Sequence, residues 1–217
     1  MAVFRTQTTM FLVNIYPPAT EPITLSEAKN HLRVEIVDDD ALITALIIAA
    51  RQYAESETGR SLITQSWRLV LDGFPGSCGP AGTAGPIPSL LPGNAILLDQ
   101  TPVQSITSIQ YLDTGGAWQT LPESEWVAEL QSAPARITPA FGKTWPTALP
   151  QIGSVKVEFV AGYGEASAVP QAIKTWMLLR IGALYEHREE VSVMRQGKIE
   201  ALPYVDRLLD AYRVPWL

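Results

Sequence analysis

The spacing of hydrophobic residues changes twice along the 217-residue chain, and this change constrains the fold more than any other feature. Up to about Arg60, and again after Gly164, apolar residues recur every three or four positions, the period of an α-helix. Between about Leu62 and Gly164 they tend to alternate, as in β-strands. We therefore expect an α+β fold in which N- and C-terminal helices pack together around a central antiparallel β-rich insertion. The helical domain would comprise residues 1–61 and 165–217, and the β module residues 62–164.

Two helices are predicted in the first zone. Thr24 and Glu27 have the spacing of a capping box, so the first helix should run from Leu25 to about Arg33. Carboxylates at 38–40 should satisfy free N–H groups at the start of the second helix, which ends at Gly59. The apolar stripe of this second helix is so broad that it must be covered on more than one side. That stripe contains Leu42, Leu46, Ala49, Ala50 and Tyr53, widened by Ile43, Ile47 and Ala54.

The middle zone predicts strands and turns. The expected strands are Ser66–Asp72, Ser105–Leu112, Trp126–Leu130 and Ser154–Val160. Turn residues between Tyr111 and Trp118 predict a β-hairpin. Residues 73–93 hold 6 Gly and 5 Pro, a density that predicts an exposed loop.

The last zone predicts two helices that begin at prolines. One should start at Pro170 and end near His187 and Arg188, and the other should start at Pro203 and leave its helical path at Pro215. The second would carry Val205, Leu208, Leu209 and Tyr212. Trp216 lies next to last in the sequence, where an aromatic residue suggests docking onto a partner.

Composition excludes several classes of protein. Sixteen Lys and Arg against 22 Asp and Glu give a net charge of −6, which argues against affinity based on neutralising phosphates. The longest nearly apolar run, Ala41–Ala50, is too short to span a membrane, and no secretory signal is evident, so we expect synthesis in the cytoplasm. One cysteine, Cys78, and two histidines provide neither an internal disulfide nor a usual zinc site. We expect no metal and no cofactor.

No motif carries a convincing catalytic site. Asp113-Thr114-Gly115 matches the aspartic protease triplet, but catalysis needs two copies and hairpin turn chemistry explains this one. Gly162-Tyr163-Gly164 lacks the further glycine of a dinucleotide-binding turn. Helix ends account for His31, His187 and the three aspartates at 38–40, and Cys78 has no cationic neighbour to stabilise its thiolate. The sequence therefore predicts a protein that is not an enzyme.

Several runs of residues resemble the head-to-tail connector, or adaptor, family of tailed bacteriophages and related gene transfer agents. In the N-terminal zone these runs are Thr24–Lys29, His31–Arg33, Asp39–Ile43, Ala49–Glu55 and Glu57–Arg60. In the C-terminal zone they are Val169–Ile173, Leu184–Glu189 and Val205–Arg213. The resemblance covers packing residues in both helical zones, and the inserted β module resembles the longer subgroup of the family.

The resemblance implies a structural protein of the virion neck, of which about twelve copies form a ring. The ring would join the portal to the tail or a stopper protein and extend the channel through which DNA passes without sequence-specific binding. It also implies a C-terminal segment that docks to the portal, which assigns portal contacts to Tyr212, Arg213 and Trp216. Candidates for self-association within the ring are Leu42, Leu46, Tyr53 and Trp176. The acidic balance predicts a channel without a continuous band of cations.

Three alternatives come from other classes. A tail-completion or stopper protein would share the β content but lack the paired terminal helices. A carbohydrate- or peptide-binding module would use exposed tryptophans in a concave patch on the sheet. An aspartic hydrolase would need Asp113 to face its counterpart in a dimer.

Overall fold

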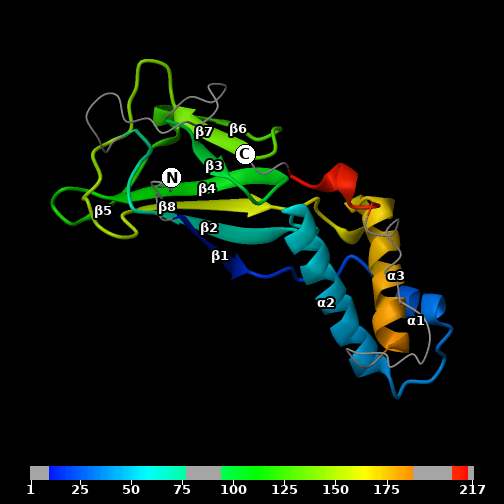
Figure 1. Ribbon diagram of the computed structural model, residues 1–217. Helices are drawn as coiled ribbons and strands as arrows, with labels where there is room; N and C mark the ends of the chain where they lie inside the picture. Colours follow the sequence, from blue (N-terminus) through cyan, green and yellow to red (C-terminus); the bar gives the residue numbers. More distant parts are fainter. Residues whose placement is uncertain (1–9, 77–93, 188–206, 215–217) are drawn as a thin grey trace, which may run out of the picture. The chain divides into compact units, whose positions relative to one another are not determined.

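The computed structural model describes residues 10–76, 94–187 and 207–214. By its internal contacts the chain divides into two compact units, and each unit is built from two segments of the sequence. The β unit takes its described residues from 1–17 and 65–161, and the helical unit takes them from 18–64 and 162–217. The predicted α+β class, with a β-rich module inserted between helical segments, is confirmed (Figure 1).

The helical unit contains both predicted N-terminal helices and the predicted helix after Pro170. Its α-helices are α1 (Leu25–Leu32), α2 (Asp40–Thr58) and α3 (Gln171–Glu186), and its short 3-10 helices are η2 (Ala166–Ala168) and η3 (Asp210–Tyr212). The capping box forms: the Glu27 N–H donates to the Thr24 hydroxyl (3.2 Å), and the Thr24 N–H donates to the Glu27 carboxylate (2.7 Å). Gly59 ends α2 in the left-handed conformation, with φ of 67°.

The aspartates before α2 act differently from the prediction. Asp39 occupies the N-cap position, but its side chain makes no capping hydrogen bond to the helix. The Asp39 carboxylate instead accepts a hydrogen bond from the Tyr185 hydroxyl of α3, and Asp40 forms an ion pair with Lys29 of α1. The carboxylates therefore tie the start of α2 to the two other helices.

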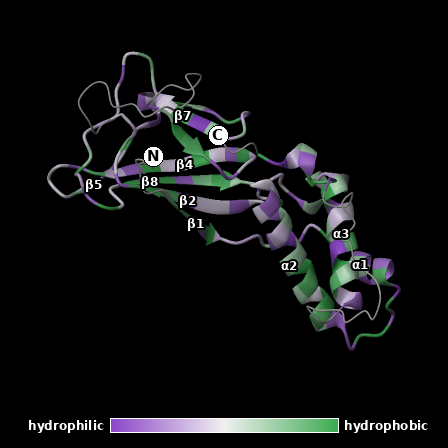
Figure 2. Cartoon of the chain, viewed as in Figure 1, coloured by the Kyte–Doolittle hydropathy of each residue, from purple (hydrophilic) through white to green (hydrophobic). Residues whose placement is uncertain are grey.

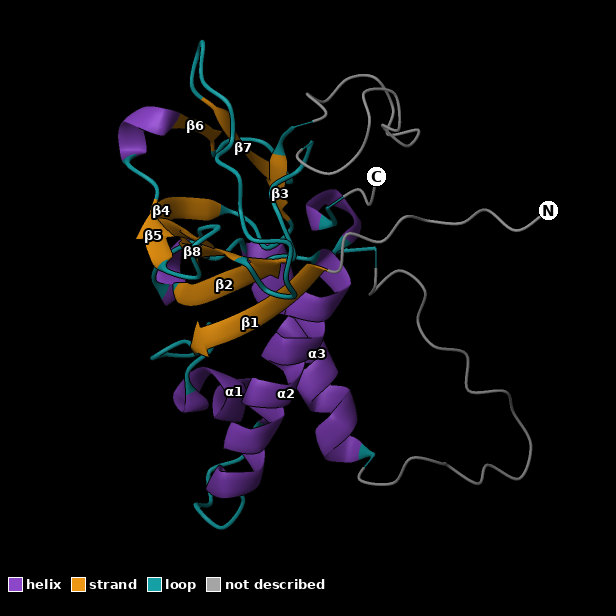
Figure 3. Cartoon of the chain, turned by 90° about the vertical axis from the view of Figure 1, so that its left-hand side faces the viewer, coloured by secondary structure: helices purple, strands orange, loops and turns teal. Residues whose placement is uncertain are grey.

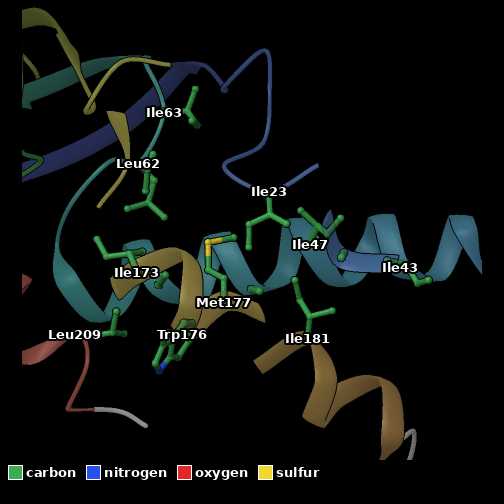
Figure 4. Close-up of a cluster of buried hydrophobic side chains, with 14 residues drawn as sticks. Ile23, Ile43, Ile47, Leu62, Ile63, Ile173, Trp176, Met177, Ile181 and Leu209 are labelled. Carbon is green, nitrogen blue, oxygen red and sulfur yellow. The ribbon is translucent and has the colours of Figure 1, made fainter. Parts of the chain in front are cut away.

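One hydrophobic core holds the helical unit together (Figure 4). On α2 the buried apolar residues are Ile43, Ile47, Ala50 and Ala54, which recur at steps of three and four. They meet Ile173, Trp176, Met177 and Ile181 of α3, all of which are completely buried. The connecting residues Leu62 and Ile63 complete this core together with Leu209 from the C-terminal part of the chain.

The β unit contains two antiparallel sheets (Figure 3). The five-stranded sheet has the order β1-β2-β8-β4-β5, and the three-stranded sheet has the order β3-β7-β6. The strands of the first sheet are β1 (Met10–Tyr16), β2 (Gln65–Leu71), β8 (Val155–Ala161), β4 (Val103–Leu112) and β5 (Trp118–Thr120). Those of the second are β3 (Ile96–Leu98), β7 (Ala135–Pro139) and β6 (Trp126–Glu129), the last preceded by the 3-10 helix η1 (Glu123–Glu125).

Both sheets bury side chains in a single core. On β8 alternate residues are buried, as expected for a central strand with one face toward the interior. Leu69 and Phe159 of the larger sheet share this core with Ile96 and Ile137 of the smaller one. The predicted hairpin is confirmed, because Leu112 of β4 pairs with Trp118 of β5 across the turn.

The structure changes three expectations. The segment Met10–Tyr16, which the prediction placed in the helical part, is strand β1 of the β unit, because it pairs with β2 more than fifty residues later. The short strands β3 and β7 were not predicted, since three to five residues carry little periodic signal. The described part of the expected helix from Pro203 is a turn and η3 rather than an α-helix, and the rest of that helix lies outside the described residues. Residues 77–93 of the predicted loop also lie outside them.

Candidate functional site

The exposed positions of α2 carry no charged residue, and its half-buried Asp40 and Glu57 are paired with Lys29 and Arg213. The exposed positions of this helix, which we call the outer face of α2, are Ala41, Leu42, Thr44, Ala45, Ile48, Ala49, Gln52, Tyr53 and Ser56. Large apolar side chains among them keep a substantial part of their surface accessible, with Leu42 37% and Tyr53 44% exposed. Figure 2 shows hydrophobic residues dominating the first half of α2. A helix that is apolar on both sides is normally covered on both sides.

The single cation of α2 points inward. Arg51 is 6% exposed and forms ion pairs with Glu21 (2.8 Å) and Glu55 (2.7 Å). The Glu55 carboxylate also accepts the backbone N–H of Leu62 at 2.9 Å. This buried network satisfies the charges locally and leaves the outer face of α2 without charge.

A second uncharged surface lies on α3. Between Gln171 and Ala183 its exposed positions recur every four residues and form what we call the outer stripe of α3: Gln171, Thr175, Leu179 and Ala183. Leu184 and Glu186, in the last turn of α3, are exposed beyond this stripe. The side chains of Arg180 and Trp176 do not belong to this stripe, because both contact the ring of Tyr53 on α2. The rings of Tyr53 and Trp176 stack with centroids 5.5 Å apart, and the Arg180 guanidinium lies 5.0 Å from the centre of the Tyr53 ring. The exposed tyrosine is therefore held in one orientation.

The structure places the predicted self-association residues at different depths. Leu42 and Tyr53 lie on the outer face of α2, and Leu46 is half-buried against the core. Trp176 is completely buried, so a partner cannot contact it directly. Its ring instead stacks against the ring of Tyr53.

The C-terminal segment is fastened to the end of α2. Leu209 and Val214 are buried, with 1% and 4% of their surfaces exposed. The Val214 N–H donates to the carbonyl of Thr58 (2.9 Å), and the Arg60 side chain donates to the carbonyl of Tyr212 (2.5 Å). These bonds hold residues 212–214 against the end of α2.

The predicted portal-docking residues belong to this segment. The side chain of Arg213 pairs with Glu57 (3.0 Å) and lies 3.7 Å from Asp210, so part of its charge is already neutralised within the chain. Tyr212 is half-buried and packs against the helical core. Trp216 lies outside the described residues.

The candidate catalytic residues have structural roles where the structure describes them. The Asp113 carboxylate accepts the backbone N–H groups of Ala117 and Gly115, both at 2.9 Å, and the Gln119 side-chain amide at 2.8 Å. The hydrogen bonds from Ala117, Gln119 and Gly115 lower the pKa of this exposed carboxyl, which keeps it ionised as a turn acceptor.

The other candidates likewise do not come together. Gly162 is fixed by a close approach to Ile63, His187 follows the last turn of α3, and His31 lies beside Gly182. Cys78 lies outside the described residues. Among the residues that the structure describes, no three His, Cys, Asp or Glu are grouped closely enough to hold a metal ion.

Among the described residues of the β unit, a shallow hollow lies on the outer side of the β6–β7 ladder. It is lined by Val127, Thr138 and the ion pair of Glu129 with Arg136 (3.2 Å). Of the described tryptophans, only Trp118 is exposed, and Lys156 covers its ring at 3.7 Å. Burial raises the pKa of Asp99, but this carboxyl does not line the hollow.

Across 10–76, 94–187 and 207–214, no helix combines the length and hydrophobicity needed to span a bilayer.

Sequence reasoning missed two features of this site. It found the broad apolar stripe of α2 but not which side is buried, because both sides are apolar and only packing distinguishes them. It also missed the attachment of the C-terminal segment to α2, which joins residues more than 150 positions apart. The only signal for this attachment was the pair of apolar residues Leu209 and Val214 near the end of a chain.

Comparison with known proteins agrees with the fold and the sequence pattern. Residues 22–93 match the family model of the phage gp6-like head-tail connector proteins. The fold is similar to a chain from the neck of an empty gene transfer agent (GTA) particle computed with C6 symmetry, with TM-score 0.72 and 23% identity over 95% of this chain and 97% of that one. It is also similar to a chain from the virion of a native GTA particle, with TM-score 0.71 and 22% identity over 95% and 96%.

A third similar chain comes from the neck of a native GTA particle computed with C12 symmetry, with TM-score 0.67 and 22% identity over 95% and 97%. No curated protein sequence matches this chain significantly. The coverage means that these relatives share the β unit as well as the helices. The resemblance to the head-to-tail connector family is therefore confirmed, by the sequence match over residues 22–93 and by a fold shared with chains of gene transfer agent particles.

Proposed function

We propose that this protein is a structural head-to-tail connector of a tailed phage or phage-like particle, located in the virion neck and without catalytic activity. The observation that supports this best is the fold similarity over 95% of the chain to a chain from the neck of a GTA particle. The family match over α1 and α2 supports the same role. The packed terminal helices favour a connector over a tail-completion or stopper protein, because that alternative would lack them.

The connector is a ring of about twelve copies that joins the portal to the tail or a stopper protein. The similar neck structures were computed with C6 and C12 symmetry, which agrees with a ring of this size. Self-association runs through the outer face of α2, with Leu42 and Tyr53 in contact and with Leu46 and Trp176 in support.

The C-terminal segment docks to the portal. Its attachment to Thr58 and Arg60 fixes residues 212–214, so the conformational entropy of these residues is not lost again on docking. The proposed contacts are Tyr212, Arg213 and Trp216, of which Tyr212 also packs against the helical core.

DNA passes through the ring without specific binding. The net charge of −6 supports a channel without a continuous band of Lys and Arg, since such a band would bind phosphates and retard the DNA. A reconstruction of the assembled ring tests this directly, and a channel lined by Lys and Arg would contradict it.

The decisive experiment is native mass measurement of the full-length protein with and without the purified portal of the same particle. We expect a ring on the portal, and a chain that ends at Val214 should fold normally but bind the portal more weakly. A full-length protein that binds no portal and never forms a ring would refute the proposed function. If the shortened chain binds the portal as well as the full-length protein does, Trp216 is not a portal contact, and the rest of the proposed function is unaffected.

A further inference from the structure

We propose that the outer face of α2 packs against the outer stripe of α3 in a neighbouring copy of the chain. This inference rests on the proposed ring, in which every subunit must present two different surfaces that fit each other. Both surfaces belong to one compact unit with a common core, so their spacing within each subunit is fixed.

The lack of charge identifies the partner surface. A charged surface placed against the outer face of α2 would lose its hydration without gaining an opposite charge, so the partner must also be uncharged. Two other exposed parts of the helical unit, within the residues that the structure describes, fail this condition, since α1 exposes Glu27 and the segment before α2 exposes Glu35 and Asp38. The outer stripe of α3 has no charge from Gln171 to Ala183, and the one exposed charge of this helix, Glu186, lies beyond its end in the last turn.

The direction of the two helices also matches. Within one subunit α2 and α3 run antiparallel: Ile173 lies near Leu62 at the end of α2, and Ile181 lies toward Ile47 and the start of α2 (Figure 4). Neighbouring copies in a ring of many subunits differ only by a small rotation, so α2 of one copy also runs antiparallel to α3 of the next.

This arrangement brings like residues together. The polar ends coincide, with Gln52 and Ser56 of α2 opposite Thr175 and Gln171 of α3. The small residues Ala45 and Ala183 then face each other near the other end of the contact, where they allow the helices to approach closely. Residues four apart form ridges, and Leu179 would fill the groove beside Ala49.

Tyr53 needs no reordering to take part in this contact. Its ring is stacked on Trp176 and covered on one side by Arg180 of the same subunit. A side chain already held in its bound orientation loses little conformational entropy when a partner arrives. Tyr53 is therefore suited to anchor the contact beside Thr175 of the neighbouring α3.

The test uses charges placed at the predicted point of contact in the full-length protein. Ala45→Glu and Ala183→Lys are exposed helical positions, so each single variant should keep its circular dichroism spectrum and melting temperature. Each should raise the concentration needed for ring formation by about 100-fold or more, because it buries an unpaired charge. Ser26→Glu on the exposed side of α1 is the matched control and should assemble as the wild type does.

Two further samples test the pairing itself. The double variant Ala45→Glu/Ala183→Lys should recover assembly. An equal mixture of the two single variants should also assemble, in rings where the two variants alternate, because every contact is then either matched or unchanged. Loss of assembly in Ala45→Glu alone, with Ala183→Lys unaffected, would overturn the pairing with α3. Normal assembly of both single variants would overturn the inference while leaving the proposed ring intact. A wild-type protein that forms no ring, alone or on the portal, would overturn both.

Discussion

At Gly162 the backbone of the helical unit passes so close to Ile63 that no side chain fits. A Cβ atom at this glycine would lie 2.3 Å from the Ile63 carbonyl oxygen, and the glycine has a φ of +134°. The contact lies between two connecting segments, in which the Tyr163 N–H donates to the carbonyl of Leu62 (3.3 Å) and the Thr64 N–H to that of Gly164 (3.2 Å). A glycine that suggested a nucleotide-binding turn thus serves backbone packing.

The substitution Gly162→Ala should therefore destabilise the protein strongly. Backbone strain and the clash with Ile63 together should cost more than about 3 kcal/mol in urea unfolding. Gly116→Ala is the control, because that glycine also has positive φ (+83°) but no atom within 4 Å of the added carbon. It should cost about 1–2 kcal/mol, and equal losses for the two variants would contradict the clash.

Trp176 and Trp118 provide a second comparison between a buried and an exposed residue. Trp176→Ala would open a cavity in the core of the helical unit and should lower its free energy of unfolding by about 3–5 kcal/mol. Trp118 is 45% exposed and contacts Lys156, so Trp118→Ala should cost about 1 kcal/mol or less. Chemical denaturation followed by circular dichroism measures both, and a small loss for Trp176→Ala would show that the core tolerates the cavity.

Among the elements, local hydrogen bonds at both ends determine the extent of α1, whereas for α2 the packing of its two sides matters most. The capping box and the left-handed Arg33 (φ 58°) delimit α1 through local hydrogen bonds alone. For α2, the local sequence sets the helix and its end at Gly59, whereas packing against α3 decides that Ile43 is buried and Leu42 is exposed.

The capping box makes part of the stability of α1 depend on pH. Hydrogen bonds from the backbone and hydroxyl of Thr24 lower the pKa of Glu27 below its usual 4.5. Because the folded pKa is depressed, this stabilisation is present above about pH 4.5 and is lost as the pH falls through the lowered value. Glu27→Gln should therefore be less stable than wild type at pH 7, and the difference should shrink at low pH. Urea unfolding at several pH values measures it, and a constant difference would contradict the assignment.

At the scale of the whole molecule, each unit is assembled from two distant segments of the chain. The helical unit requires residues from both sides of the β insertion, and Leu209 and Val214 add buried surface to its core. The C-terminal segment is therefore part of the folded unit as well as the proposed route to the portal.

Removing Pro203–Leu217 should destabilise the helical unit without unfolding the β unit. Leu209 and Val214 each contribute about 1.5–3 kcal/mol through burial, so the loss should be about 3 kcal/mol or more. A chain that ends at Val214 should unfold at the wild-type urea concentration, because it keeps both residues and the bond to Thr58. Equal stability of the two shortened chains would contradict a structural role for residues 207–214.

The sequence by itself determined the class, the helices and most of the larger sheet, because capping boxes, terminal glycines and alternating runs act over a few residues. It also indicated the family through its packing residues. Tertiary structure decided the rest. Strand β1, the attachment of Val214 to Thr58 and the burial of Trp176 depend on partners far away in the chain. An apolar side chain does not specify which neighbour will cover it, so only the packed structure separates the core of α2 from its uncharged outer face.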